Sequence, residues 1–303
     1  MQRRSFLALA ALAARARANV RGMQLHLSCS ALGIQASQRE AIDLAAAHGF
    51  DAVDADGKFL NTLPEIALAE LAGYMREKKI GWAMAGLPVE FRRDDEAFSA
   101  GMAPLPAYAR GLQRAGVVKV TTYVLPRSDT LTYLSNFKLH ATRLREIARV
   151  LGDSEIRFGI EYVAPKTLWT TGRYPFVHTM AEARELIAEI NRPHVGLVLD
   201  SWHWYHAGDT AADIAALPAD AVVSVDLNDA PAGVPKDQMV DNRRELPAST
   251  GVIDLRAFLG ALEGIGFHGP VRAEPFNEAV RKMSPPEAAA AAAAALRKAL
   301  VGG

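Results

Sequence analysis

Eight short apolar segments alternate with eight helical segments along almost the whole chain. The apolar segments are rich in Val, Ile, Leu and Ala, and they predict strands at 23–28, 50–56, 80–86, 117–124, 156–161, 195–200, 221–226 and 271–274. A helical pattern follows each of them, at 38–48, 63–79, 94–115, 131–151, 179–190, 211–217, 255–264 and 286–300. Regular alternation of strands and helices is typical of a parallel sheet, and eight such units close into a barrel. We therefore predict an α/β fold, a single (β/α)8 TIM barrel.

The first 18 residues differ from this pattern. Arg3 and Arg4 precede an apolar run at 8–14, and the small residues Ala16 and Ala18 follow, which together are typical of a cleaved export signal. The order Arg-Arg-x-Phe-Leu resembles a twin-arginine signal, and the apolar run is too short to span a bilayer. We predict a signal peptide at 1–18, a barrel domain at 19–303, a periplasmic location and no membrane contact after cleavage. The alternative is an Arg- and Ala-rich tail that carries no address.

Composition excludes several classes of partner and site. Lys plus Arg and Asp plus Glu both total 34, so the chain lacks the basic surplus expected of a nucleic-acid-binding protein. Cys29 is the single cysteine, which excludes an intramolecular disulfide and a thiolate metal cluster. The sequence leaves the oligomeric state open, including a homo-oligomer.

Carboxylates stand at the ends of the last four predicted strands. These residues are Glu161, Asp200, Asp226 and Glu274. Ligands of parallel barrels bind at the carboxyl ends of the strands, so the four side chains are expected at one rim. Each alone is explained by a helix cap or a salt bridge, but four together would repel one another strongly. The set therefore favours one divalent metal ion. Oxygen ligands suit Mn²⁺ or Mg²⁺, and His203, three residues after Asp200, leaves Co²⁺ or Zn²⁺ open.

These residues resemble a known family. The Gly-Ile-Glu stretch ending at Glu161, the spacing of Asp200 and His203, the run from Asp226 to Asp229, Arg244 before Pro247, and Ala-Glu at 273–274 are together similar to the xylose-isomerase-like barrels. That superfamily includes sugar isomerases, ketose 3-epimerases, inositol-catabolism enzymes and endonucleases of the endonuclease IV type. The resemblance covers residue 23 to the C-terminus.

The resemblance implies roles for individual residues. The four carboxylates match the family's metal ligands, and Glu161 and Glu274 also match its acid/base pair. His203 matches a histidine that faces a substrate oxygen, and Arg244 an arginine that contacts substrate or orders the site. Two departures stand out. Asp226 occupies a position that is usually histidine in the epimerase branch, and residues 247–251 replace a Pro-Gly-Glu-Gly loop.

The chemistry expected of such a site begins with a proton next to a carbonyl. A divalent cation acidifies that proton and stabilises the enediolate formed when it leaves. Return of the proton gives epimerisation or isomerisation, and loss of a beta substituent gives elimination. We predict a sugar isomerase or epimerase acting on an unphosphorylated sugar or keto-sugar, because no glycine-rich phosphate loop is present. The alternatives are a keto-glycoside lyase or dehydratase and a non-catalytic sugar-binding barrel. Endonuclease activity is disfavoured, since the histidines of its three-zinc site are missing.

Three further residues are candidates for substrate contact. Trp202 lies beside Asp200 and is suited to stack on a sugar face or to pack beneath the rim. His206 is suited to bind substrate or to cap a turn. Asp56 ends the second predicted strand, where it either accepts hydrogen bonds from substrate hydroxyls or caps a loop.

Overall fold

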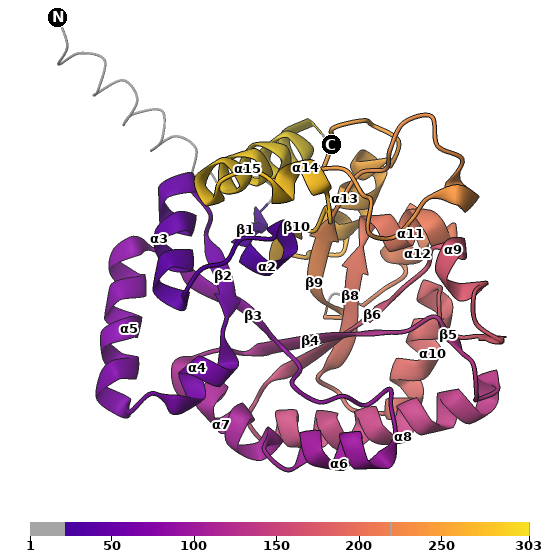
Figure 1. Cartoon of the computed structure of the whole chain (residues 1–303), viewed down its shortest axis with the longest axis horizontal. Helices are drawn as coiled ribbons and strands as arrows, with labels where there is room; N and C mark the ends of the chain where they lie inside the picture. Colours follow the sequence, from indigo (N-terminus) through magenta and orange to yellow (C-terminus); the bar gives the residue numbers. More distant parts are fainter. Residues whose placement is uncertain (1–21, 219, 303) are drawn as a thin grey trace, which may run out of the picture.

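A closed barrel of eight parallel strands forms the centre of the molecule (Figure 1). The computed structural model describes residues 22–218 and 220–302, so the predicted signal peptide lies outside the described residues. The strands follow one another around the barrel in the order β1-β10-β9-β8-β6-β4-β3-β2. Their bounds are β1 Gln24–Leu27, β2 Ala52–Ala55, β3 Gly81–Gly86, β4 Lys119–Val124, β6 Arg157–Tyr162, β8 Val195–Asp200, β9 Val222–Leu227 and β10 Pro270–Ala273. The predicted (β/α)8 TIM barrel is confirmed.

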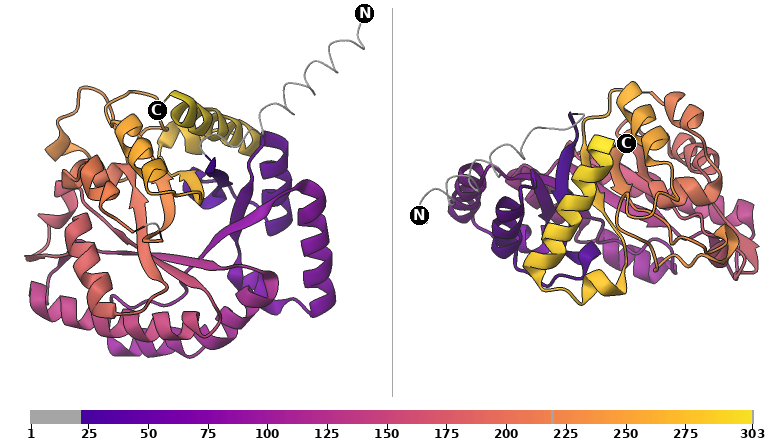
Figure 2. Two further views of the ribbon diagram at one scale, coloured as in Figure 1. Left: turned by 180° about the vertical axis from the view of Figure 1, so that it is seen from behind. Right: turned by 90° about the horizontal axis from the view of Figure 1, so that it is seen from above.

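Helices surround the barrel (Figure 2). The long ones are α3 Gln38–His48, α5 Glu65–Lys78, α6 Asp95–Met102, α7 Leu105–Ala115, α8 Tyr133–Gly152, α10 Met180–Ile190, α13 Leu255–Gly264 and α15 Pro285–Gly302. The short ones are α2 Cys29–Leu32, α4 Gly57–Thr62, α9 Lys166–Trp169, α11 Ser201–Ala207, α12 Ala211–Ala215, α14 Glu278–Arg281 and the 3₁₀ turn η2 Lys236–Gln238. Within the part of the chain that the structure describes, no helix has both the length and the apolar character needed to cross a bilayer.

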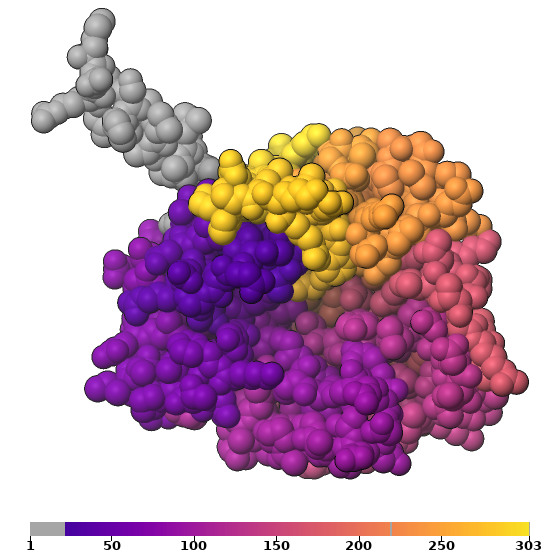
Figure 3. All heavy atoms as spheres, viewed as in Figure 1, coloured from indigo at the N-terminus to yellow at the C-terminus, as the bar shows by residue number. Residues whose placement is uncertain are grey.

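The barrel closes where the two ends of the described chain meet. β1 pairs in parallel with β10, and α15 packs beside α3. On the surface of the molecule, the yellow C-terminal part of the chain lies against the indigo N-terminal part (Figure 3). Every residue of β8 and β9 is buried, which agrees with their continuous apolar sequence. β8 and β9 therefore hold the carboxylates near their ends, Asp200 and Asp226, in fixed positions.

One predicted helix is wrong. The segment 94–115 forms two helices, α6 and α7, rather than one. Pro104 lies at the break and Pro106 in the first turn of α7, and a proline inside a continuous helix would remove a backbone hydrogen bond and clash with the preceding turn. The short helix α4, which Asp56 caps, was also not predicted.

Two long connections at the rim carry small elements of their own. The connection after β6 contains α9 and the strand β7 Tyr174–Pro175, which pairs antiparallel with β5 Arg127–Ser128. The connection after β9 contains η2 and Arg244. Residue 229 of this connection holds it in shape, because the Asp229 carboxylate accepts hydrogen bonds from the backbone N–H groups of Ala230, Thr250, Gly251 and Ile253. Arg244 is therefore carried by an ordered loop rather than by a strand.

Candidate metal and active site

Four carboxylates from four neighbouring strands meet at the carboxyl rim. Asp200 is the last residue of β8, Glu161 and Asp226 are the last but one of β6 and β9, and Glu274 directly follows β10. One oxygen from each lies within 4.8 Å of one oxygen from every other. Asp200 and Asp226 are fully buried, and the Glu161 and Glu274 side chains are 12% exposed. The structure thus brings together the four residues predicted as metal ligands.

Arg272 neutralises part of this charge from within the barrel. It lies beside Asp226 in the pairing of β10 with β9. Its Nε and Nη2 donate to the two oxygens of Asp226 at 2.7 and 2.8 Å, and Nη2 also donates to Glu274 Oε1 at 2.9 Å. This two-pronged geometry is the strongest form of an arginine–carboxylate pair.

Arg244 approaches the same cluster from the loop after β9. Its Nη1 donates to Asp200 Oδ2 at 2.7 Å and to Glu274 Oε2 at 3.1 Å. Asp241 holds the other side of the guanidinium, because its backbone oxygen and Oδ1 accept from Arg244 Nε and Nη2. The Arg244 side chain is only 2% exposed, so its position is set by these contacts.

Glu161 is the one carboxylate of the four that receives no arginine. Its Oε1 is buried and has no hydrogen-bond partner among the described residues. Two guanidiniums facing four carboxylates leave two negative charges when all are ionised, and a buried charge without a partner is costly. A divalent cation would remove this deficit and give Glu161 a partner. The donor set therefore fits one divalent metal ion.

The pKa values of these carboxyls reflect the same crowding. Burial raises the pKa of Glu161 well above its usual range, and the charges of Glu274, Asp226 and Asp200 add to the effect. Burial raises the pKa of Asp200 to about 7, although Arg244 opposes the shift. Burial also raises the pKa of Glu274 against the opposing charge of Arg272. A cation that binds here must therefore compete with protons.

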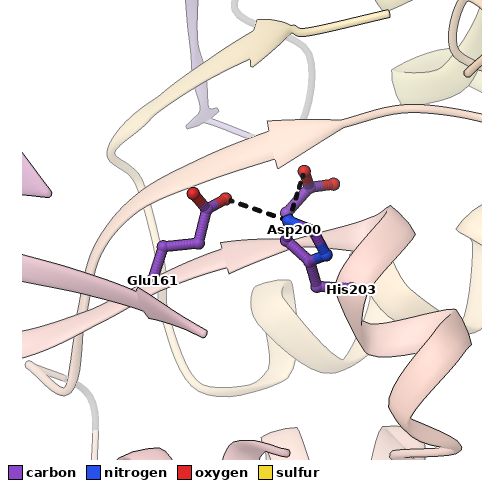
Figure 4. A group of neighbouring side chains, drawn as sticks. All are labelled: Glu161, Asp200 and His203. Carbon is purple, nitrogen blue, oxygen red and sulfur yellow. Dashed lines mark ion pairs between the residues drawn. The ribbon is translucent and has the colours of Figure 1, made fainter. Parts of the chain in front are cut away.

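His203 faces Glu161 and Asp200 from the first turns of α11. Its Nε2 lies 3.8 Å from Glu161 Oε1 and 3.9 Å from Asp200 Oδ2 (Figure 4). The backbone N–H of Ala164 donates to Nδ1 at 3.3 Å, and Arg244 Nη2, which is also a donor, lies 3.4 Å from Nε2. Burial and Arg244 hold the pKa of His203 well below its usual value, which keeps the ring neutral. His203 thus presents Nε2 to the cluster. An unprotonated Nε2 would make it a metal ligand with Glu161 and Asp200, which is the second ligand grouping in the structure.

The other candidate residues lie at different depths. Trp202 is fully buried beneath the rim, where its Nε1 donates to Asp241 Oδ1 and its ring lies under Arg244. His206 packs on Trp202 with ring centres 4.1 Å apart, and its Nδ1 bonds to the Trp202 carbonyl. Asp56 is exposed on the side of the barrel formed by β2, where its Oδ1 accepts from the N–H of Phe59 as the cap of α4.

Three residues of the site were not predicted from the sequence. Arg272 and Asp241 hold the charges described above, and Asn228 links two of the carboxylates. The Asn228 Nδ2 donates to Asp200 Oδ1 at 2.9 Å, and its Oδ1 accepts from the backbone N–H of Glu274 at 3.1 Å. Arg272 carried a readable signal, since residues two apart on a strand share a face and Arg272 precedes Glu274 by two. No sequence signal placed Asp241 beside Arg244 and Trp202 at once.

The fold and the site together define a parallel barrel with a cluster of four carboxylates at its carboxyl rim. The model of the family described as "Xylose isomerase-like TIM barrel" matches residues 42–299, and the chain belongs to this family.

Relatives of known activity include isomerases and dehydratases. The inosose isomerase of Bacillus velezensis is 24% identical over 254 residues, covering 82% of this chain and 87% of the relative. The 3-dehydroshikimate dehydratase of Pseudomonas aeruginosa is 32% identical over 145 residues, which cover 47% of this chain and 21% of the relative.

Solved structures with the same fold cover nearly the whole chain. A xylose isomerase domain protein of Alicyclobacillus acidocaldarius is 31% identical with a TM-score of 0.81, covering 93% of this chain and all of that one. The IolI protein with a bound zinc atom is 23% identical with a TM-score of 0.77, covering 92% of this chain and 99% of that one.

Proposed function

We propose that the protein is a metal-dependent isomerase or epimerase of an unphosphorylated sugar or keto-sugar, which moves a proton next to a carbonyl. The observation that carries this proposal is the carboxylate cluster with the buried, unpartnered Glu161 Oε1. The inosose isomerase relative supports it, since that name describes the same class of reaction on a polyhydroxylated ketone.

Glu161, Asp200, Asp226 and Glu274 would hold the metal ion. The oxygen donors favour Mn²⁺ or Mg²⁺, and the zinc in the IolI structure together with His203 supports Zn²⁺ or Co²⁺ as alternatives. The ion would polarise the substrate carbonyl and stabilise the enediolate that forms.

Glu161 and Glu274 would carry out different proton transfers. Glu161 and Glu274 come from strands on different sides of Asp200 and Asp226, so they approach a bound substrate from different directions. Glu161 makes no ion pair with an arginine, so it would accept the proton, and Glu274 would return it. Proton return at the opposite face gives an epimer, and return at the neighbouring carbon gives an isomer.

His203 and Arg244 position the substrate in this proposal. His203 Nε2, which lies 3.8 Å from Glu161 Oε1, would contact a substrate oxygen. Arg244 stays cationic next to Asp200 and Glu274, and it excludes a second cation from that side of the cluster. Asp56, His206 and Trp202 remain proposals as substrate contacts, with Trp202 acting through Arg244.

Elimination is the second candidate reaction. The 3-dehydroshikimate dehydratase relative supports it, because dehydration also begins with removal of a proton next to a carbonyl. We also propose that the protein acts in the periplasm after export through the twin-arginine route, and the order of residues at Arg3, Arg4 and Phe6 supports this location. Sugar phosphates are chiefly cytoplasmic, so this location agrees with an unphosphorylated substrate.

Deuterium exchange tests the function directly. The purified full chain, loaded with Mn²⁺, is incubated in D₂O with free and phosphorylated ketoses, keto-cyclitols and keto-glycosides. We expect exchange next to the carbonyl with the free compounds, and a loss of about 10²- to 10⁴-fold in Glu161→Gln. Glu278→Gln, an exposed glutamate on α14, is the matched control and retains full exchange. Exchange confined to phosphorylated sugars would overturn the substrate, and no exchange with any carbonyl compound would leave a sugar-binding barrel.

A further inference from the structure

A cavity that is separate from the carboxylate cluster lies at the rim. It has a volume of about 400 Å³ and shares no lining residue with the cluster. Its walls come from the connection between β3 and α6, the connection between β4 and α8, and the first turns of α8. These three segments are distant from β8, β9 and β10 in sequence, so the cavity is a separate feature of the rim.

Guanidinium groups are the commonest charged groups in the lining of this cavity. Arg92, Arg93 and Arg127 line it together with one carboxylate, Asp94. Asp94 caps α6, with Oδ1 accepting from the N–H of Ala97, and its charge also lies near Arg93. The carboxylates that pair with Arg92 and Arg127, Glu90 and Asp129, do not line the cavity, so the lining itself presents mainly guanidinium groups.

The three arginines differ in how firmly they are held. Arg92 is fixed by hydrogen bonds to the carbonyl of Tyr123 and the hydroxyl of Thr122, and by an ion pair with Glu90. Arg127 donates to Asp129 at 3.0 Å and its side chain is 38% exposed. The Arg93 side chain makes no hydrogen bond to another described residue and is exposed. Arg93 and Arg127 are thus able to turn toward a ligand.

Two neutral groups add donors that the protein leaves unused. Asn136 is 5% exposed and lines the cavity, and its side-chain amide has no hydrogen-bond partner among the described residues. Its amide atoms are not among the fully buried polar atoms that lack a partner, so they are open to the cavity and available to a ligand or water. The Ser128 Oγ accepts from the N–H groups of Thr130 and Leu131, so its own proton is free to be donated into the cavity.

The helix beside the cavity reinforces this polarity. α8 has 20 residues and begins at Tyr133, and the partial positive charge of its N-terminus lies next to Thr130 and Leu131 of the wall. Leu125, Leu131 and Leu139 supply an apolar side. A cationic, donor-rich end joined to an apolar side matches a small organic anion.

We propose that this cavity binds the oxyanion group of a small molecule, a carboxylate or a phosphate monoester, through Arg93, Arg127, Ser128 and Asn136. The carbon portion of the ligand packs on the leucines. The site does not depend on the metal centre or on the reaction proposed above, so its occupancy is measured by binding alone.

Calorimetric titration of the full chain tests this site. The probes are inorganic phosphate and propionate at constant ionic strength, with chloride as the reference anion. We expect saturable binding of at least one probe, weakened at least about tenfold in Arg93→Ala/Arg127→Ala, which corresponds to about 1.4 kcal/mol. Arg149→Ala removes a comparable ion pair, Arg149–Asp153, near the far end of α8, and leaves the affinity unchanged.

A second variant separates recognition from charge. Asn136→Leu keeps the volume of the side chain and removes its amide, so a weaker affinity at an unchanged thermal midpoint supports direct recognition by Asn136. Phosphate binding alone assigns the site to phosphate monoesters, and propionate binding alone assigns it to carboxylates. The proposal is overturned if neither probe binds saturably or if the double arginine variant binds as the wild type does.

Discussion

The two halves of the barrel rim differ in the residues at the ends of their strands. In one half, β6, β8, β9 and β10 end at or beside the four carboxylates of the cluster, which Arg244 and Arg272 partly neutralise. In the other half, β1, β2, β3 and β4 end in apolar or small residues, Leu27, Ala55, Gly86 and Val124. The side chains above this second half are more exposed, such as Tyr123 at 46% and Leu125 at 45%.

This difference places the proposed proton transfer in the half with the carboxylate cluster and the proposed anion binding in the other half. Buried like charges raise the folding free energy, and the protein retains them only in the half where a cation would use them. In the other half, His26 Nε2 lies 2.8 Å from Asp54 Oδ1, and the Asp54 side chain is 32% exposed. Substitutions in the carboxylate half should therefore affect metal binding and stability strongly, whereas substitutions in the other half should affect them little.

Removal of Asp200 should have the largest effect on metal binding. In Asp200→Ala the cluster loses a ligand, and Arg244 keeps only Glu274 as a partner within the cluster. We expect the affinity for Mn²⁺ to fall by more than about 100-fold, since loss of groups that merely support a ligand already costs 10- to 100-fold. Calorimetry with Mn²⁺ measures this, and circular dichroism verifies the barrel. Asp94→Ala, an exposed carboxylate from the other half of the rim, should bind Mn²⁺ as the wild type does. Full metal occupancy in Asp200→Ala would remove Asp200 from the ligand set.

Arg272 provides the next test. Arg272→Met leaves Asp226 buried without its cation, and breaking such a pair costs about 3–5 kcal/mol of unfolding free energy. Urea unfolding of the metal-free protein measures the loss. The double variant Arg272→Met/Asp226→Leu replaces both charges by apolar groups and should recover most of it. Arg92→Met, in the other half, should cost less, because its carboxylate partner Glu90 is 42% exposed and remains hydrated. Equal losses of unfolding free energy in the Arg272 and Arg92 variants would contradict the difference between the two halves.

Much of the site followed from position along the chain. Glu161, Asp200, Asp226 and Glu274 were predictable because each ends an apolar segment, and the ends of parallel strands share one rim. The partners of these residues were not predictable in the same way. The contact between Arg272 and Asp226 depends on the register of β10 against β9, and the contact between Arg244 and Asp241 depends on the course of a long loop. The rim cavity around Asn136 requires three segments to meet, and no local pattern encodes that meeting.

The pH dependence of stability gives a smaller, more specific test. Burial raises the pKa of Asp200 to about 7, so the folded metal-free protein holds a proton that the unfolded chain releases near pH 4. Stability is therefore complete at low pH and is lost as the pH rises through about 7, by on the order of 2 kcal/mol. Urea unfolding between pH 5 and pH 8 measures this slope. Asp200→Asn should flatten it, and saturating Mn²⁺ should reverse it because the metal displaces the proton. A metal-free protein that gains stability between pH 5 and pH 8 would contradict the burial argument.

The smallest effect concerns Asp56, a carboxylate at the end of β2. Its Oδ1 accepts from the N–H of Phe59 at 3.1 Å, and its own N–H donates to Gln38 Oε1 at 2.7 Å. The first bond makes it the cap of α4, and loss of such a cap costs about 1 kcal/mol. We expect Asp56→Ala to lower the unfolding free energy by this amount and to leave the affinity for Mn²⁺ unchanged. Asp56→Asn, which keeps a capping oxygen, should retain most of the stability. A contact with substrate hydroxyls would show itself differently, because KM would then rise in both variants at unchanged kcat, and Asp56 would join the substrate site on the half of the rim that lacks the carboxylate cluster.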